Sequence, residues 1–238
     1  LEESLKEGKV TEEQINAACR RVLEAKYKLG LFSDPYKYCD TLRTRENLYT
    51  AEHRSSARTI ATETFVLLKN DHHLLPLDIK GKIALIGPMA DARNNMCGMW
   101  SMTCTPSRHG TLLEGIRSAA GDKAEILYAK GSNIYYDAET EKAATGIRPL
   151  ERGDNRQLLD EALRIAARAD VIVAALGECA EMSGESVSRT NLEIPDAQQD
   201  LLKALVKTGK PVVLLLFTGR PLVLNWEATN VHSILNVW

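Results

Sequence analysis

The sequence predicts an α/β fold, a three-layer sandwich in which helices flank a mostly parallel sheet on both faces. Short apolar runs of strand length alternate with amphipathic stretches of helix length, and most of the turns between them are short. The run Val171–Leu176 is entirely apolar, as expected for a strand that is covered on both faces. A parallel sheet with helical crossovers is the economical way to connect such a pattern.

The elements are expected in a definite order. The first helix covers 11–29, where Thr11 and Gln14 can form a capping box and Gly30 provides a stop. A second helix begins after Thr50 and runs to about Leu68, with its apolar side facing a core. The remaining helices are expected at about 111–119, 156–169 and 195–206, and the strands at 82–87, 125–129, 171–176, 211–217 and 232–238.

Composition excludes several classes of protein. Among 238 residues, 30 Lys and Arg stand against 32 Asp and Glu, whereas a nucleic-acid-binding protein usually carries a basic excess. No stretch approaches the ~20 apolar residues that span a bilayer. The five cysteines form no CxxC pair, which argues against a tetrathiolate zinc site. Cys97 and Cys104 are close enough in sequence to pair, but free and mostly buried thiols are the expectation.

Both ends of the chain predict an internal fragment of a longer protein. The apolar stripe of the first helix needs a partner, so this helix is expected to be the last element of a preceding unit. At the other end, 233–238 has the pattern of a buried strand, whereas natural termini are usually polar and frayed.

Three longer segments follow predicted strand ends, where open α/β sheets bind their ligands. They are 88–110, 177–194 and 218–221. The second holds four carboxylates and Arg189, which is consistent with a mobile loop that presents a general acid and base. Spacing alone favours a merely solvated acidic loop, and it does not choose among Glu178, Glu181 and Glu185.

Other side chains allow two interpretations each. Trp100, set among small and polar residues, suits a sugar-stacking platform or a plug on the domain surface. Arg220 suits a ligand contact or a pair with a loop carboxylate. His72 and His73 lack a third ligand at suitable spacing, so no metal is expected. No glycine-rich phosphate turn and no G-x-S-x-G elbow are present, so no dinucleotide cofactor and no serine nucleophile are expected.

Several short stretches occur in the order found in glycoside hydrolase family 3, and the chain resembles this family, in particular its bacterial periplasmic β-glucosidase type. They are residues 23–32, 63–70, 74–77, 86–88, 98–101, 128–131, 185–190 and 218–222. The resemblance implies that 1–35 end a (β/α)₈ barrel, that 36–50 are a linker, and that 51–238 form an α/β sandwich domain truncated at its C-terminus.

The resemblance also implies a function, that of a retaining exo-acting β-glucosidase without cofactor or metal. Its nucleophile would be an Asp on the barrel, outside this chain, and Glu185 would be the general acid/base. Trp100 and Arg189 would bind substrate, with Arg189 also suited to orient Glu185 or its loop. Some relatives carry a second Trp where Cys104 stands, so a clamp of two rings is not expected.

The expected partners are a β-glucoside or oligosaccharide and the barrel domain of the same chain, with neither nucleic acid nor membrane, and family habit suggests a homodimer. The expected location is periplasmic or secreted. The alternatives are a β-xylosidase, another exo-β-glycosidase, or a non-catalytic carbohydrate-binding or scaffolding domain.

Overall fold

The computed structural model describes residues 1–101 and 103–238, which divide into two compact units, Leu1–Ala61 and Thr62–Trp238. The first unit contains the helices α1 (Glu2–Lys6), α2 (Glu12–Lys28) and α3 (Thr41–Asn47), and α4 (Ala51–Thr64) leads into the second. Thr11 and Gln14 form the expected capping box of α2, with hydrogen bonds of 3.2 and 2.9 Å. Among the described residues, no helix is both long and apolar enough to cross a membrane. The domain limits at residues 35 and 50 stay predictions.

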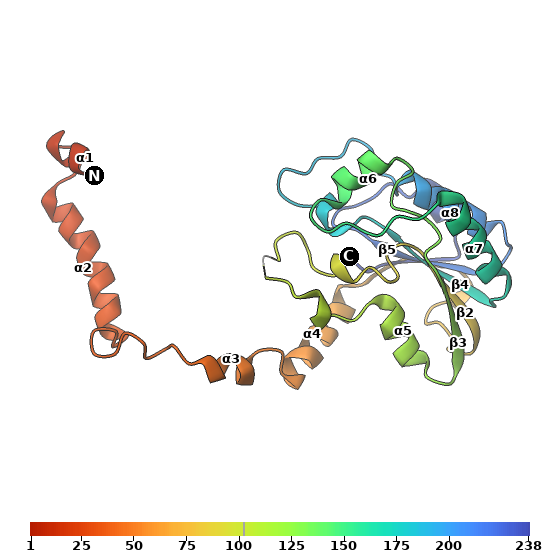
Figure 1. Cartoon of the computed structure of the whole chain (residues 1–238), viewed down its shortest axis with the longest axis horizontal. Helices are drawn as coiled ribbons and strands as arrows, with labels where there is room; N and C mark the ends of the chain where they lie inside the picture. The colour runs from red at the N-terminus through yellow and green to blue at the C-terminus, as the bar shows by residue number, and fades with distance from the viewer. Residues whose placement is uncertain (102) are drawn as a thin grey trace. The chain divides into compact units, whose positions relative to one another are not determined.

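The second unit is built on one six-stranded sheet, as far as the described residues show (Figure 1). The strand order is β1-β6-β5-β4-β2-β3, and every neighbouring pair is parallel except β1 and β6. The strands are β1 (Val66–Asn70), β2 (Gly81–Ile86), β3 (Ala124–Ala129), β4 (Val171–Gly177), β5 (Val212–Phe217) and β6 (Ser233–Asn236).

Helices cover both faces of this sheet, so the three-layer α/β prediction is confirmed. On one face the core packs against α7 (Asn155–Ala167), α8 (Asp196–Val206) and α9 (Asn225–Asn230). On the other face it packs against α5 (Leu112–Ala120), α6 (Ala138–Thr145) and residues 74–77. Alternate residues of the strands point to opposite faces, as the burial of Ile172 in one core and Val173 in the other illustrates.

The prediction of a helix that continues to Leu68 was wrong. The helix α4 ends at Thr64, and Val66–Asn70 form the edge strand β1, paired antiparallel with β6. The Val-Leu-Leu run can continue a helical stripe or form a strand, and pairing with β6 selects the strand. Ser233 donates a hydrogen bond to Asn70 at 2.9 Å across this pair. The short helices α6 and α9 were not predicted either.

Candidate functional site

Loops from the carboxyl ends of β2, β4 and β5, which are neighbours in the sheet, surround one cavity of about 330 Å³. Its lining includes residues from all three segments that the sequence singles out: Asn95, Met96, Gly98, Met99, Glu178, Cys179, Ala180, Ser183, Thr218 and Gly219. Phe217, the last residue of β5, and Trp238 complete the lining. Trp100, Glu185 and Arg189 belong to these loops but do not line the cavity.

The loop after β4, residues 177–194, is called the Glu185 loop below, and its first residue is held tightly. Gly177 has φ of +137°, and a Cβ there would lie 1.9 Å from the Phe217 carbonyl oxygen, so the position requires glycine. Gln198, which is fully buried on α8, donates to the Gly177 carbonyl at 2.9 Å and accepts from its N–H at 2.8 Å. These contacts fix where the strand ends and the loop begins.

Glu178 is the central anchor of the Glu185 loop, and its side chain is 1% exposed. Its Oε1 forms ion pairs with Arg189 and, at 3.2 Å, with Arg220. Its Oε2 accepts hydrogen bonds from the Thr218 hydroxyl at 2.9 Å and from the Gly219 N–H at 3.3 Å. The carboxylate therefore ties both ends of its own loop to the segment after β5, and Arg220 pairs with a loop carboxylate, one of its two expected roles.

Glu181 is also committed to a partner. It lies in a short 3₁₀ turn, Ala180–Met182, and its side chain is 10% exposed. Its Oε1 lies 3.5 Å from Nε of Arg148, which comes from the connection between α6 and α7. Of the three carboxylates that spacing could not separate, two are thus paired with arginines.

Glu185 differs from both. It is exposed, and among the described residues no hydrogen bond or ion pair engages its carboxylate. It occupies the second position of a turn that the Val187 N–H closes onto the Gly184 carbonyl at 3.4 Å. Ser186, the next residue, has φ of +60°, a conformation that is uncommon for residues with a side chain. The backbone therefore projects Glu185 from a turn on an anchored base.

Trp100 lies on a loop that is closed by a disulfide between Cys97 and Cys104. The expectation of free thiols at these two positions was wrong, because their Cα atoms lie 6.3 Å apart, which is within the range that a disulfide bridges. Residues 97–104 are called the Trp100 loop below. Trp100 is 67% exposed as a residue, so it does not plug the domain surface.

Arg189, predicted to bind substrate or to orient Glu185, is directed to the base of the loop. Besides the ion pair with Glu178, its Nη2 donates to the Glu193 carbonyl at 3.0 Å, and its side chain is 11% exposed. The guanidinium therefore organises the loop through Glu178 and does not contact Glu185.

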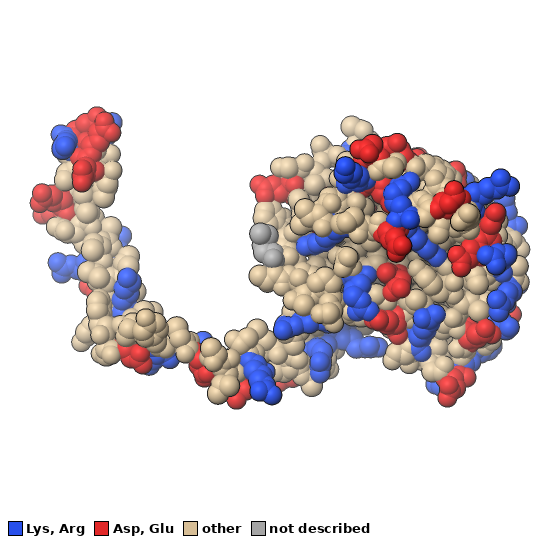
Figure 2. All heavy atoms as spheres, viewed as in Figure 1, with Lys and Arg blue, Asp and Glu red and all other residues tan. Residues whose placement is uncertain are grey.

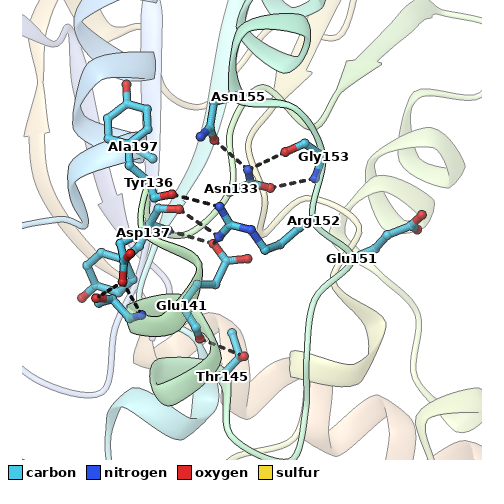
Figure 3. Close-up of polar contacts among 12 residues, drawn as sticks. Asn133, Tyr136, Asp137, Glu141, Thr145, Glu151, Arg152, Gly153, Asn155 and Ala197 are labelled. Atoms are coloured by element: carbon cyan, nitrogen blue, oxygen red, sulfur yellow. Dashed lines mark hydrogen bonds and ion pairs between the residues drawn. The ribbon is translucent and has the colours of Figure 1, made fainter.

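A polar network that the sequence patterns do not reveal holds the connection from β3 to α7 (Figure 3). Buried Asn133 exchanges hydrogen bonds with the backbone of Gly153, at 2.8 and 3.0 Å. Arg152 pairs with buried Glu141 and donates to the carbonyl of Tyr136 at 3.0 Å. The signal that could have found this network is the length of the segment 130–154, which separates β3 from α7 and contains only the short helix α6 among its described elements.

The described cysteines beside these loops have defined chemical states. One cluster, Cys97, Cys104 and His109, has ligand atoms within 4.8 Å of one another, but its two sulfurs are joined in the disulfide and are not thiolates. Cys179 is buried beside the cavity, and burial raises the pKa of its thiol to about 12, so it is a poor nucleophile.

Figure 2 shows charges of both signs interspersed over the viewed face of the second unit, Thr62–Trp238.

Comparisons with known proteins identify the family. Residues 65–238 match the model described as the glycosyl hydrolase family 3 C-terminal domain. The periplasmic beta-glucosidase of Salmonella typhimurium is 43% identical over 242 residues, which cover 98% of this chain and 31% of that protein. The beta-xylosidase of Formosa agariphila is 34% identical over 230 residues, which cover 94% of this chain and 29% of that protein.

Among solved structures, the beta-glucosidase from Listeria innocua in complex with glucose superposes with a TM-score of 0.76 at 31% identity, covering 100% of this chain and 29% of that one. A D270A mutant of the Listeria enzyme has also been solved in complex with laminaribiose. The chain thus spans about three tenths of the length of these relatives.

The fold and the loops define an α/β sandwich whose polar side chains gather at the carboxyl ends of its strands. The chain belongs to glycosyl hydrolase family 3, and its residues 65–238 correspond to the C-terminal domain of that family.

Proposed function

We propose that the chain is the acid/base-bearing part of a retaining exo-β-glucosidase that removes terminal non-reducing β-D-glucosyl residues. In this mechanism an Asp on a barrel domain attacks the anomeric carbon, and Glu185 protonates the leaving oxygen. Glu185 then deprotonates the water that releases glucose from the covalent intermediate. The barrel, which lies outside this chain, would bring its carboxylate within ~5–5.5 Å of Glu185.

One observation carries the assignment of Glu185. Glu178 and Glu181 are neutralised by arginines, whereas Glu185 is exposed and unengaged among the described residues. A general acid/base must reach a substrate and exchange a proton with it, which a carboxylate locked in a buried ion pair cannot do. The exposed turn that carries Glu185 supports this role.

Trp100 enters the proposal as an aromatic surface for the leaving group, because its exposed ring can stack on the apolar face of a sugar. Arg189 was predicted to bind substrate, and its ion pair with Glu178 instead supports the alternative role of holding the loop. The likeness to a periplasmic relative supports a periplasmic or secreted location.

A β-xylosidase is the second candidate, supported by the 34% identity to the Formosa enzyme. Activity on aryl β-glucosides against aryl β-xylosides, measured with the barrel-containing enzyme, separates the two. A non-catalytic carbohydrate-binding or scaffolding domain would have no need of Glu185 beyond contact with sugar, so the test below addresses it as well.

The test replaces Glu185 in the full-length enzyme. For Glu185→Gln we expect kcat/KM on a disaccharide to fall by about 10²–10⁴-fold, because its leaving group needs a proton. An aryl glucoside with a good leaving group should lose much less. With Glu185→Ala, azide should restore turnover of the aryl glucoside and yield β-glucosyl azide, because this anion attacks the intermediate without a base.

Glu193→Gln is the matched control, since Glu193 is an exposed residue of the same loop and its carboxylate accepts a 3.3 Å hydrogen bond from Gln199. It should leave both substrates little changed. Equal losses on both substrates for Glu185→Gln, or no loss, would reject the assignment. We also expect the 238-residue chain alone to be inert, and robust hydrolysis by it would contradict the proposed division of carboxylates.

A further inference from the structure

We propose that Arg148 is a positioning residue that joins the Trp100 loop and the Glu185 loop into one unit. The inference rests on the proposed function, in which Trp100 contacts the leaving group and Glu185 protonates its oxygen. If both residues act on the same leaving group, their relative placement matters for catalysis, and Arg148 is the side chain that bridges the two loops.

The contacts of Arg148 with the Trp100 loop are all made to backbone carbonyls. Its Nη1 donates to the carbonyls of Cys97 and, at 2.9 Å, Gly98. Its Nη2 donates to the carbonyl of Ser101 at 3.4 Å. These carbonyls flank Trp100 within the loop that the disulfide closes, so the guanidinium and the disulfide together restrict the backbone that carries the ring.

The contact of Arg148 with the Glu185 loop is ionic. Nε lies 3.5 Å from Oε1 of Glu181, and both side chains are largely buried, at 13% and 10% exposure. A charge buried to this degree is costly to leave without its partner, which favours the arrangement in which one arginine serves both loops. Glu181 lies four residues before Glu185, so the ion pair fixes the start of the segment that projects the acid.

Two further contacts support this bridge: one joins the Glu185 loop to Asn95, two residues before the Trp100 loop, and the other joins the two loops directly. The Ala180 N–H donates a hydrogen bond to Oδ1 of Asn95 at 2.7 Å. A Cβ on Gly184 would lie 2.1 Å from Sδ of Met99, so these neighbours of Glu185 and Trp100 are already in close contact. The coupling therefore extends from the base of both loops to their tips, and the ion pair between Arg148 and Glu181 is its charged component.

In this proposal the two joined loops act on the leaving group of the substrate. A shift of the Trp100 loop alone would move the aglycone away from the acid, and a shift of the Glu185 loop alone would move the acid away from the oxygen. Misplacement by about 1 Å can cost 10²-fold in rate. The loss should appear mainly with substrates whose leaving group needs protonation, and less with those that leave unaided.

The test compares Arg148→Lys with Arg152→Lys in the full-length enzyme. Arg152 is a matched control because its guanidinium also binds backbone carbonyls, of Tyr135 and Tyr136, and one buried carboxylate, of Glu141 (Figure 3). These described partners lie outside both loops. Arg148→Lys keeps the charge but loses the planar fork that reaches three carbonyls.

For Arg148→Lys we expect kcat/KM on a disaccharide such as laminaribiose to fall about 10- to 100-fold, with a much smaller loss on dinitrophenyl β-glucoside. Arg152→Lys should affect both substrates by the same factor. Hydrogen exchange supplies a readout independent of catalysis: amides of both loops should exchange faster in Arg148→Lys and not in Arg152→Lys. If Arg148→Lys does not accumulate, Glu181→Gln removes the same ion pair from the other loop.

The outcomes separate the two proposals. If neither loop exchanges faster in Arg148→Lys than in Arg152→Lys, the coupling is refuted. If both loops loosen but the two substrates lose activity equally while Glu185→Gln discriminates between them, the positioning role is refuted and the acid assignment stands. If both loops loosen and Glu185→Gln does not discriminate, the physical coupling is supported and the proposed function fails.

Discussion

Replacing Glu178 with Gln tests the idea that a buried carboxylate holds the Glu185 loop in place. The substitution keeps the size and one acceptor oxygen but removes the charge that neutralises Arg189 and Arg220. The new NH₂ group must face either a guanidinium or the donors Thr218 and Gly219, and each choice sets one donor against another.

The magnitude follows from burial. Removing one partner of a buried ion pair costs about 3–5 kcal/mol, because the remaining charge has lost its compensation. The side chains of Arg189 and Arg220 are 11% and 22% exposed, so water relieves part of that cost, and Arg189 keeps its bond to the Glu193 carbonyl. We therefore expect a loss of about 2–4 kcal/mol in the free energy of unfolding.

The assay is urea unfolding of the 238-residue chain, followed by circular dichroism. Glu125→Gln is the matched control, since this carboxylate also faces two cations, Lys82 at 3.3 Å and Arg168 at 3.9 Å, but is 50% exposed. Exposed pairs contribute about 0–1 kcal/mol, so the control should change stability little. A loss below about 1 kcal/mol for Glu178→Gln, or equal losses for both variants, would refute the role of burial.

Two further predictions concern titratable groups. Burial raises the pKa of Glu227 above its ordinary 4.5, so the folded chain loses stability as pH rises through that raised pKa. Glu227→Gln mimics the neutral acid, so this variant should match the stability of the wild type at low pH and exceed it at pH 7. Equal unfolding midpoints of the two proteins in urea at both pH values would contradict this. In a thiol titration, the two exposed cysteines of the N-terminal unit should react in the native chain, and Cys179 should react only in denaturant. Cys97 and Cys104 should react only after reduction. Five reactive thiols in denaturant without reductant would contradict the disulfide.

The layered α/β fold could be predicted because its signals are local. A strand covered on both faces must be apolar throughout, and β4 is buried along its whole length. The capping box at Thr11 and Gln14 is likewise contained within four residues. The edge strand β1 could not be predicted in this way, because its aliphatic residues also continue the pattern of α4. Its pairing with β6, more than 160 residues away, decides between the two.

The candidate site likewise has features that depend on local sequence and features that depend on distant residues. Sequence could identify the loops that follow β2 and β4, since their positions depend only on strand order. Sequence could not say which of the loop carboxylates are held in ion pairs, because their partners come from distant parts of the chain. Arg148 lies 33 residues before Glu181, and Arg220 lies 42 residues after Glu178. The disulfide was missed for a related reason, since a spacing of seven residues permits a bond without requiring the loop to close.

The state of Glu185 bears on the proposal that the two carboxylates of the reaction are divided between two domains. A carboxyl group serves as a general acid near neutral pH when its surroundings are partly desolvated. The described residues leave Glu185 exposed, and those around it supply neither an ion pair nor a hydrogen bond to its carboxylate. In the proposed mechanism the desolvation must therefore come from substrate and from a second surface that closes over the turn. In that mechanism the anchoring by Glu178 and Arg148 has a physical purpose. The surroundings of Glu185 become desolvated only when substrate and the second surface meet the loop, so the loop has to hold Glu185 in a fixed position beforehand.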